Sequence, residues 1–202
     1  MEWPALESDP GILTDYMKRL GLRENWEFQE IFDMDEDFLH PQAILLTYSN
    51  VNEAFPGTAA TVPVFIKQVQ GLGNACGLIA CLHALGNLGA DIEPGSTLDS
   101  LFQQLRGKTS EESGHFLYNY QNIRDAHQEF SCVGQSEQQD DTEYHFIAVL
   151  PGFIICDGMR ATPIQLNCQG DLFTGFIGEV RRMLAEGRIS DRISLIGLVR
   201  NS

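Results

Sequence analysis

The most informative segment of this chain is QGLGNACGLIACLHALGN, residues 70–87. Its early glycines mark a tight turn, and the apolar spacing that follows predicts a helix from Ala75 to about Leu85, with Asn74 as its cap. Apolar residues surround this helix on nearly every side, so we expect it to be central and buried. Cys76 lies just inside the helix start, where the helix dipole favours the thiolate, the nucleophilic form of cysteine.

The elements around this stretch predict one mixed α/β domain, residues 1–202, in which helices cover a central sheet. Besides the helix at 75–85, helices are expected at 9–21, 97–105, 110–129 and 171–187. Strands are expected at 43–48, 62–69 and 194–199, and in a hairpin over 145–157 that turns at Pro151-Gly152. The turn formers in 49–61 predict an exposed loop.

The excess of acidic residues argues against some classes of binding partner. Of the 202 residues, 28 are acidic and 13 are basic, which gives a net charge of −15. No basic face suited to nucleic acid is visible, and an acidic membrane surface would repel the chain. A basic partner would be attracted, although the charge could also serve only to keep the protein soluble.

The N-terminal residues and the hydropathy of the chain indicate in which cellular compartment the protein is expected. No run of about 18 apolar residues exists, so no transmembrane helix is expected. The acidic start MEWPALESDP lacks the basic and apolar parts of a secretory signal peptide. We therefore expect a cytoplasmic protein, with the nucleus as a second possible compartment.

The cysteines do not form the pattern of a disulfide or zinc scaffold, because their number is odd and no CxxC pair occurs. We therefore expect reduced thiols, no metal and no cofactor. All except Cys76 are interpreted as small core hydrophobes. The five are Cys76, Cys81, Cys132, Cys156 and Cys168.

A nucleophilic thiolate needs a base and a group that orients the base. His145 opens an apolar strand directly after the long polar segment 131–143, and Asp157 ends the next strand. If the hairpin centres on Pro151, these two residues lie directly opposite each other, with Cβ atoms ~4.5–5.5 Å apart. An ordinary histidine–aspartate pair at a strand end is the alternative. The remaining histidines are interpreted as structural: His40, His83, His115 and His127.

Acyl transfer also needs donors for the oxyanion. Gln70 precedes Cys76 by six residues, and the turn between them could return its side-chain amide to the helix start. In a strand, Gln68 would point the same way as Gln70, so geometry alone does not separate the two glutamines. The glycines also match part of a dinucleotide-binding turn, but Cys76 occupies the place of the third glycine and no parallel βαβ unit follows.

Residues 70–87 resemble the active-site segment of the ubiquitin C-terminal hydrolases. In that family a glutamine precedes the cysteine by six residues, Asn-x-Cys-Gly follows, and His-Ala continues the helix; Gln70, Asn74, Cys76, Gly77 and His83-Ala84 stand at those places. This spacing selects Gln70 over Gln68.

The resemblance spans nearly the whole chain. YHFIAVL and FIICDG resemble the family's histidine and aspartate strands, which implies the same roles for His145 and Asp157. WPALESDP, LGLRENWEFQEIF, YNYQNIRDAHQE and RISLIGLV resemble further family segments. Met159-Arg160 departs from the usual order after the aspartate, which leaves the role of Arg160 open.

The resemblance implies a knotted α/β sandwich, with a central and mostly antiparallel sheet flanked by helices, related to the papain-like cysteine proteases. It further implies that Cys76 attacks the carbonyl of the terminal glycine of ubiquitin or a close ubiquitin-like protein. His145 would act as base and then as acid, Asp157 would orient His145, and Gln70 with the N–H of Cys76 would hold the oxyanion.

The resemblance also limits the substrate. The segment 131–143 would arch over the active site, and its thirteen residues give an arch roughly 15–20 Å across, from ~3.6 Å per residue. We therefore expect action on small or unfolded leaving groups, with residues 4–9 as a contact for ubiquitin and the basic ubiquitin tail attracted to the acidic chain. A monomer is expected because the sequence shows no interface signature. Two other functions remain open: a ubiquitin-binding module without catalysis, and a redox-sensing thiol protein.

Overall fold

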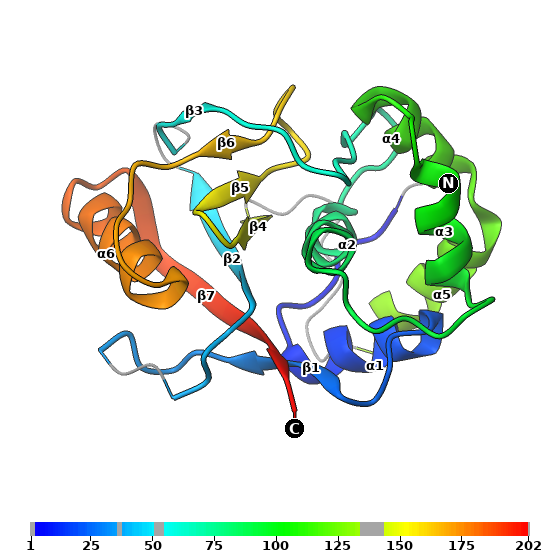
Figure 1. Ribbon diagram of the computed structural model, residues 1–202, viewed down its shortest axis with the longest axis horizontal. Coiled ribbons are helices and arrows are strands. Elements are labelled where there is room, and N and C mark those ends of the chain that lie inside the picture. The colour runs from blue at the N-terminus through cyan, green and yellow to red at the C-terminus, as the bar shows by residue number, and fades with distance from the viewer. Residues whose placement is uncertain (1–2, 36–37, 51–54, 134–143, 202) are drawn as a thin grey trace.

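A single seven-stranded sheet forms the middle of the protein in a computed structural model that describes residues 3–35, 38–50, 55–133 and 144–201 (Figure 1). The strands lie in the order β1-β7-β2-β4-β5-β6-β3, and neighbouring strands are antiparallel. They are β1 (Trp26–Glu30), β2 (Ala43–Asn50), β3 (Thr58–Ala59), β4 (Tyr144–Leu150), β5 (Ile154–Cys156), β6 (Ile164–Gln165) and β7 (Ile189–Arg200).

Helices cover both faces of this sheet. Five of the six helices in the described residues lie on one side of β2 and β7, and α6 lies on the other (Figure 1). The helices are α1 (Pro10–Leu20), α2 (Cys76–Leu88), α3 (Thr97–Leu105), α4 (Ser110–Asn119), α5 (Gln121–Ser131) and α6 (Leu172–Ala185). The predictions for α1, α3, α6 and the last strand are confirmed, although β7 begins earlier than expected.

The inner strands are buried on both faces, as a middle layer requires. In β2, Ala43 and Leu45 join the hydrophobic cluster that contains α2, whereas Ile44 and Leu46 join the cluster that contains α6. The predicted class, a mixed α/β domain with a central antiparallel sheet flanked by helices, is therefore confirmed. The knot stays a prediction, because the chain path includes residues outside the described ranges.

The helix that carries Cys76 is the central helix, as its apolar composition predicts. Every residue from Cys76 to Leu85 is buried. Its N-cap is Ala75, with no side-chain cap, so the prediction of Asn74 as the cap is wrong. The preceding turn needs glycine, since Gly71 and Gly73 have φ angles of 99° and 48°.

The strand predicted at 62–69 is wrong. These residues lie outside the sheet, and their backbone groups find other partners. The N–H of Val64 donates to Oδ1 of Asn87 at 2.9 Å, and the N–H of Ile66 donates to Nε2 of His83 at 2.8 Å. Side chains of α2 thus replace the neighbouring strand that the β-branched composition predicts.

The single helix predicted at 110–129 is also wrong, because the chain breaks at Tyr120 into α4 and α5. Tyr120 has an extended conformation (φ −84°, ψ 94°), and its N–H donates to the carbonyl of Leu117. Arg124 donates to the carbonyl of Tyr118, which the break leaves without a helical partner. An apolar periodicity that continues through both helices hides such a break.

Two predicted loops also differ from the structure. The loop predicted at 49–61 contains β3 and the end of β2. The arching segment predicted at 131–143 begins inside α5, because Ser131 is the last residue of that helix. Residues 134–143 of that segment lie outside the described residues.

Candidate active site

Cys76 occupies the first position of α2, at the point where the central helix meets the glycine turn. Its side chain is buried at the edge of the larger hydrophobic cluster, and Sγ lies 4.0 Å from the carbonyl oxygen of Asn74. The helix start directs backbone N–H groups toward this position. A negative charge on the sulfur or on a bound group is therefore favoured here.

His145 reaches this cysteine from β4. It pairs with Tyr48 of β2, and the Tyr48 ring packs edge-on against the imidazole with centroids 6.2 Å apart. Burial alone would lower the pKa of His145, but hydrogen bonds and charge from Asp157 and Cys76 outweigh burial and raise that pKa to about 9. The structure thus brings together the thiol and the imidazole that the sequence predicts.

Asp157 holds the far side of the imidazole. Nε2 of His145 lies 2.7 Å from Oδ1 of Asp157, and both side chains are largely buried. The same oxygen accepts a hydrogen bond from the N–H of Met159 at 2.9 Å, and Nε of Arg160 lies 3.7 Å from the other oxygen. Burial would raise the pKa of Asp157, but these partners hold it below its usual value.

The sequence predicts that His145 and Asp157 lie directly opposite each other, but the structure places them otherwise. β4 pairs with β5 through Ala148↔Cys156 and Leu150↔Ile154, a register that places Ile147 opposite Asp157. His145 is therefore a diagonal neighbour of Asp157, and diagonal neighbours lie within reach of long side chains. The prediction of direct opposition is wrong, although the predicted interaction exists.

Arg160 makes two interactions that the sequence did not predict. Besides its ion pair with Asp157, its Nη2 donates to the carbonyl of Phe55 at 2.9 Å. The turn that carries it is also held by Lys67, whose Nζ donates to the carbonyls of Met159 and Arg160. The signal in the sequence was the position of Arg160 three residues after the aspartate.

Two other histidines are buried in structural settings, as predicted. Burial lowers the pKa of His83 and of His127 to about 4, so both are neutral near pH 7. His83 stacks on Phe65 and accepts a hydrogen bond from Ile66. His127 bonds to the carbonyl of Pro4 at 2.8 Å and fixes the N-terminal segment.

The two candidate glutamines lie in different environments. Gln70 is exposed at the start of the glycine turn. Gln68 is only partly exposed, and its Nε2 donates to the carbonyl of Gly73 at 2.6 Å. Because residues 62–69 form no strand, the expectation that both side chains point the same way loses its basis.

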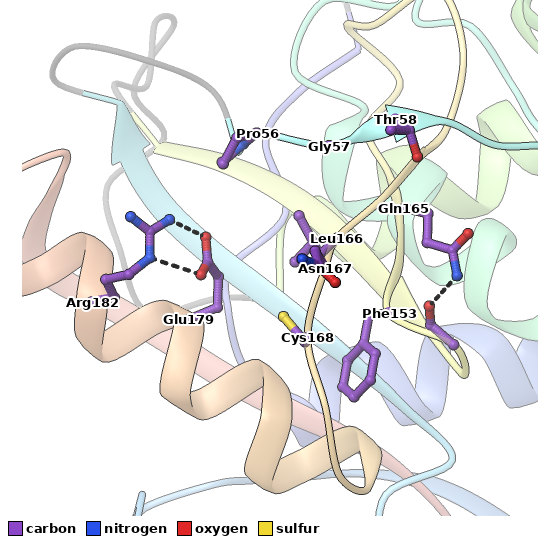
Figure 2. A pocket seen from close by; sticks show the side chains of 11 residues that line it. Pro56, Gly57, Thr58, Phe153, Gln165, Leu166, Asn167, Cys168, Glu179 and Arg182 are labelled. Atoms are coloured by element: carbon purple, nitrogen blue, oxygen red, sulfur yellow. Dashed lines mark hydrogen bonds and ion pairs between the residues drawn. The ribbon is translucent and has the colours of Figure 1, made fainter.

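A pocket of about 880 Å³ lies elsewhere, between β6 and α6 (Figure 2). Figure 2 shows Arg182 paired with Glu179 at one side and Cys168 beside them. The described residues that line it do not include Cys76, His145 or Asp157. The cluster of Cys76, His145 and Asp157 therefore lies outside this pocket.

A thiol at the start of a central helix, beside an imidazole that a carboxylate holds, is the arrangement of a cysteine peptidase. The comparison with protein families agrees with this class. The family model "Ubiquitin carboxyl-terminal hydrolase, family 1" matches residues 3–185. The chain belongs to this family, which confirms the resemblance found in the sequence.

Individual relatives cover most of the chain. "Ubiquitin carboxyl-terminal hydrolase 3" of Arabidopsis thaliana is 32% identical over 81% of this chain and 78% of its own length. "Ubiquitin carboxyl-terminal hydrolase YUH1" of Saccharomyces cerevisiae is 29% identical over 84% of this chain and 77% of its own length.

A solved structure shows the same fold. The catalytic domain of UCH37 from Trichinella spiralis, bound to ubiquitin vinyl methyl ester, superposes with a TM-score of 0.78 at 23% identity. The match covers 100% of this chain and 97% of the other. No helix in the described part of this chain is long and apolar enough to cross a membrane.

Proposed function

We propose that this chain is a deubiquitinating thiol hydrolase that cleaves amide, peptide or ester bonds after the C-terminal glycine of ubiquitin or a close ubiquitin-like protein. The observation that carries the proposal is the contact of His145 with Cys76 on one side and with Asp157 on the other. One sheet joins strands from residue 26 to residue 200, which supports a single catalytic domain over residues 1–202.

The reaction begins with the thiol. Because Nε2 of His145 is bonded to Asp157, Nδ1 is the nitrogen available to accept the proton of Cys76. The thiolate attacks the carbonyl carbon of the terminal glycine, and the carbonyl electrons move to oxygen. When they return, the C–N bond breaks, His145 protonates the leaving amine, and a thioester remains.

Water completes the reaction. His145, neutral after giving up its proton, accepts a proton from water as the water attacks the thioester. Collapse of the second oxyanion releases the carboxylate of ubiquitin and the sulfur of Cys76. Since the pKa of His145 is about 9, the imidazole is protonated near pH 7 when Cys76 is ionised, and it can donate directly to the leaving amine.

The oxyanion needs donors near the start of α2. The N–H of Cys76 is one candidate, because the first N–H groups of a helix have no helical acceptor. Gln70 as the side-chain donor stays a prediction from the family spacing.

Ubiquitin is the proposed partner. The family of this chain supports this choice, and the Trichinella relative of the same fold is bound to ubiquitin vinyl methyl ester. The net charge of −15 favours docking of a basic tail. The five cysteines form no disulfide with one another, which is consistent with a reducing compartment such as the cytosol.

The preference for small or unfolded leaving groups rests on the segment 131–143, most of which lies outside the described residues. Cleavage of ubiquitin fused to a short peptide should exceed cleavage of a ubiquitin dimer. Equal rates for the two substrates would refute this preference while leaving the reaction itself intact.

The decisive experiment is hydrolysis of a ubiquitin C-terminal fluorogenic amide by the wild-type protein and by Cys76→Ala. We expect turnover by the wild type and none by the variant. A ubiquitin probe with an electrophilic C-terminus provides the second readout. Binding without covalent capture would instead support a non-catalytic ubiquitin-binding module, and sensitivity of Cys76 to oxidation without ubiquitin binding would support a redox sensor.

A further inference from the structure

Lys67 joins the segment that precedes the nucleophile to the turn that follows the candidate aspartate. Its Nζ donates to the carbonyl of Met159 at 2.6 Å and to the carbonyl of Arg160 at 3.0 Å. The next residue, Gln68, donates its backbone N–H to the carbonyl of Gly158 at 2.8 Å. Three consecutive carbonyl groups of the turn thus accept hydrogen bonds from two adjacent residues.

The backbone of Lys67 is itself held in place. Its N–H donates to the carbonyl of Ser110, the first residue of α4, at 2.9 Å, and its carbonyl accepts from the N–H of Val69 at 2.9 Å. The packing against α4 is close, because a Cβ at Gly114 would lie 2.1 Å from the carbonyl oxygen of Lys67. The ammonium therefore reaches the turn from a backbone that is fixed against a helix.

Met159 connects this ammonium to the catalytic carboxylate. Its carbonyl accepts from Lys67, and its N–H donates to Oδ1 of Asp157 at 2.9 Å. The same Oδ1 lies 2.7 Å from Nε2 of His145. A shift of the turn would therefore move the N–H that fixes this oxygen, and the oxygen in turn holds the imidazole.

The two carbonyl groups need a donor that serves both of them. An ammonium carries three hydrogens and a full charge, so it can satisfy the oxygens of Met159 and Arg160 at once. The side chain of Lys67 is only partly exposed, so water screens these bonds less than it would at an open surface. Without the ammonium, the two oxygens would have to turn toward water, and the turn would open.

We propose that Lys67 is a positioning residue, whose ammonium holds the turn after Asp157 so that the carboxylate stays in place to orient His145. This assignment rests on the proposed thiol hydrolase function. In this role Lys67 acts through Asp157 and not on the reacting atoms. It should therefore influence turnover only as long as the carboxylate is present.

The test is a double-mutant cycle between Lys67→Met and Asp157→Asn in the full chain. Methionine keeps most of the length of the lysine stem and removes the ammonium. Lys108→Met is the matched control, because it removes the same charge from a side chain that lies over the ring of Phe116. The readouts are kcat and KM for the ubiquitin fluorogenic amide, and urea unfolding verifies that each variant is folded in the assay.

We expect Lys67→Met to lower kcat by about 10–100-fold, because a small displacement of a catalytic group costs that much. KM should stay within about threefold of wild type, and Lys108→Met should keep both constants within about threefold. In the Asp157→Asn background, Lys67→Met should lower kcat by less than about threefold, because the carboxylate through which it acts is gone.

Three results would overturn the assignment: a kcat of Lys67→Met within about threefold of wild type, an equal loss in Lys108→Met, or an equal loss with and without the carboxylate. The third result would show that Lys67 supports the fold and not Asp157. If Lys67→Met does not fold, Lys67→Ala takes its place in the cycle, since alanine adds no long apolar side chain. A failure of both variants to fold would also overturn the assignment. Failure of the proposed function is distinguishable, since the wild type itself would then not hydrolyse the amide.

Discussion

The imidazole Nε2 of His145 and the carboxylate Oδ1 of Asp157 lie 2.7 Å apart, and that oxygen is held independently by the N–H of Met159. Arg160 approaches the second oxygen from the same turn. The carboxylate is therefore fixed even when the imidazole moves. A fixed acceptor determines which ring nitrogen carries the hydrogen and which one faces the thiol.

Asp157→Asn should lower kcat for the ubiquitin amide by roughly 10²–10⁴-fold, because the amide no longer holds His145 in the required tautomer and no longer stabilises its charge. KM should change little, since Asp157 is buried beneath the imidazole. Asp171→Asn is the matched control. Asp171 caps α6, and asparagine caps a helix equally well, so activity and stability should be kept. Equal kcat in Asp157→Asn and wild type would contradict the orienting role.

The stability of the protein should depend on the charge of His145. Its pKa is about 9 in the folded protein against 6.5 for the free side chain, so the folded state binds the proton more tightly. This contribution is fully present below about pH 6.5 and is lost as the pH rises toward about 9. The urea unfolding free energy of wild type minus that of His145→Gln should therefore fall by roughly 1–3 kcal/mol between pH 6 and pH 9. A difference that grows with pH would disprove this linkage.

Two helical glycines should respond in opposite directions to alanine. A Cβ at Gly114 in α4 would lie 2.1 Å from the carbonyl oxygen of Lys67, whereas a Cβ at Gly178 in α6 would meet nothing within 4 Å. We expect Gly178→Ala to raise the free energy of unfolding by roughly 0.5–1 kcal/mol, through helix propensity. Gly114→Ala should lower it by about 1–3 kcal/mol, because the backbone must shift. Urea denaturation measures both, and stabilisation by Gly114→Ala would show that α4 does not pack as closely as described.

Trp3 should be a large contributor to stability. Its side chain is buried, its ring lies 4.9 Å from that of His127, and its carbonyl accepts a hydrogen bond from Asn74 beside the nucleophile. Trp3→Ala should lower the free energy of unfolding by about 3–5 kcal/mol. Phe32→Ala is the control, because Phe32 is 86% exposed and its loss should change stability by less than about 0.5 kcal/mol. Similar effects in the two variants would indicate that the N-terminal segment is not packed as described.

Local pattern was enough to predict α2 and its chemistry. The glycine turn, the apolar helix and the cysteine at its start all lie within residues 70–87. Local pattern also predicted the two caps of α1, which are Asp9 at its N-terminus and Gly21 at its C-terminus. Signals of this kind come from neighbouring residues, so the sequence displays them directly.

Features that depend on distant partners were not predictable. Residues 62–69 have the composition of a strand, but their backbone bonds go to side chains of α2. The hairpin register shifted because Gly152 and Phe153 both adopt positive φ angles, and a phenylalanine in that conformation has no sequence signal. The hydrogen bonds of Gln68 to the carbonyls of Gly73 and Gly158 likewise join segments that only the fold brings together.

The arrangement of the sheet has a consequence for synthesis of the protein. β4, which carries the base, pairs with β2, and β2 pairs on its other side with β7, near the end of the chain. Until β7 has been made, one edge of β2 has no neighbouring strand, so we expect the β2–β4 pair that carries His145 to be less firmly held. We therefore expect full hydrolytic activity only after the last strand has been translated and has paired with β2.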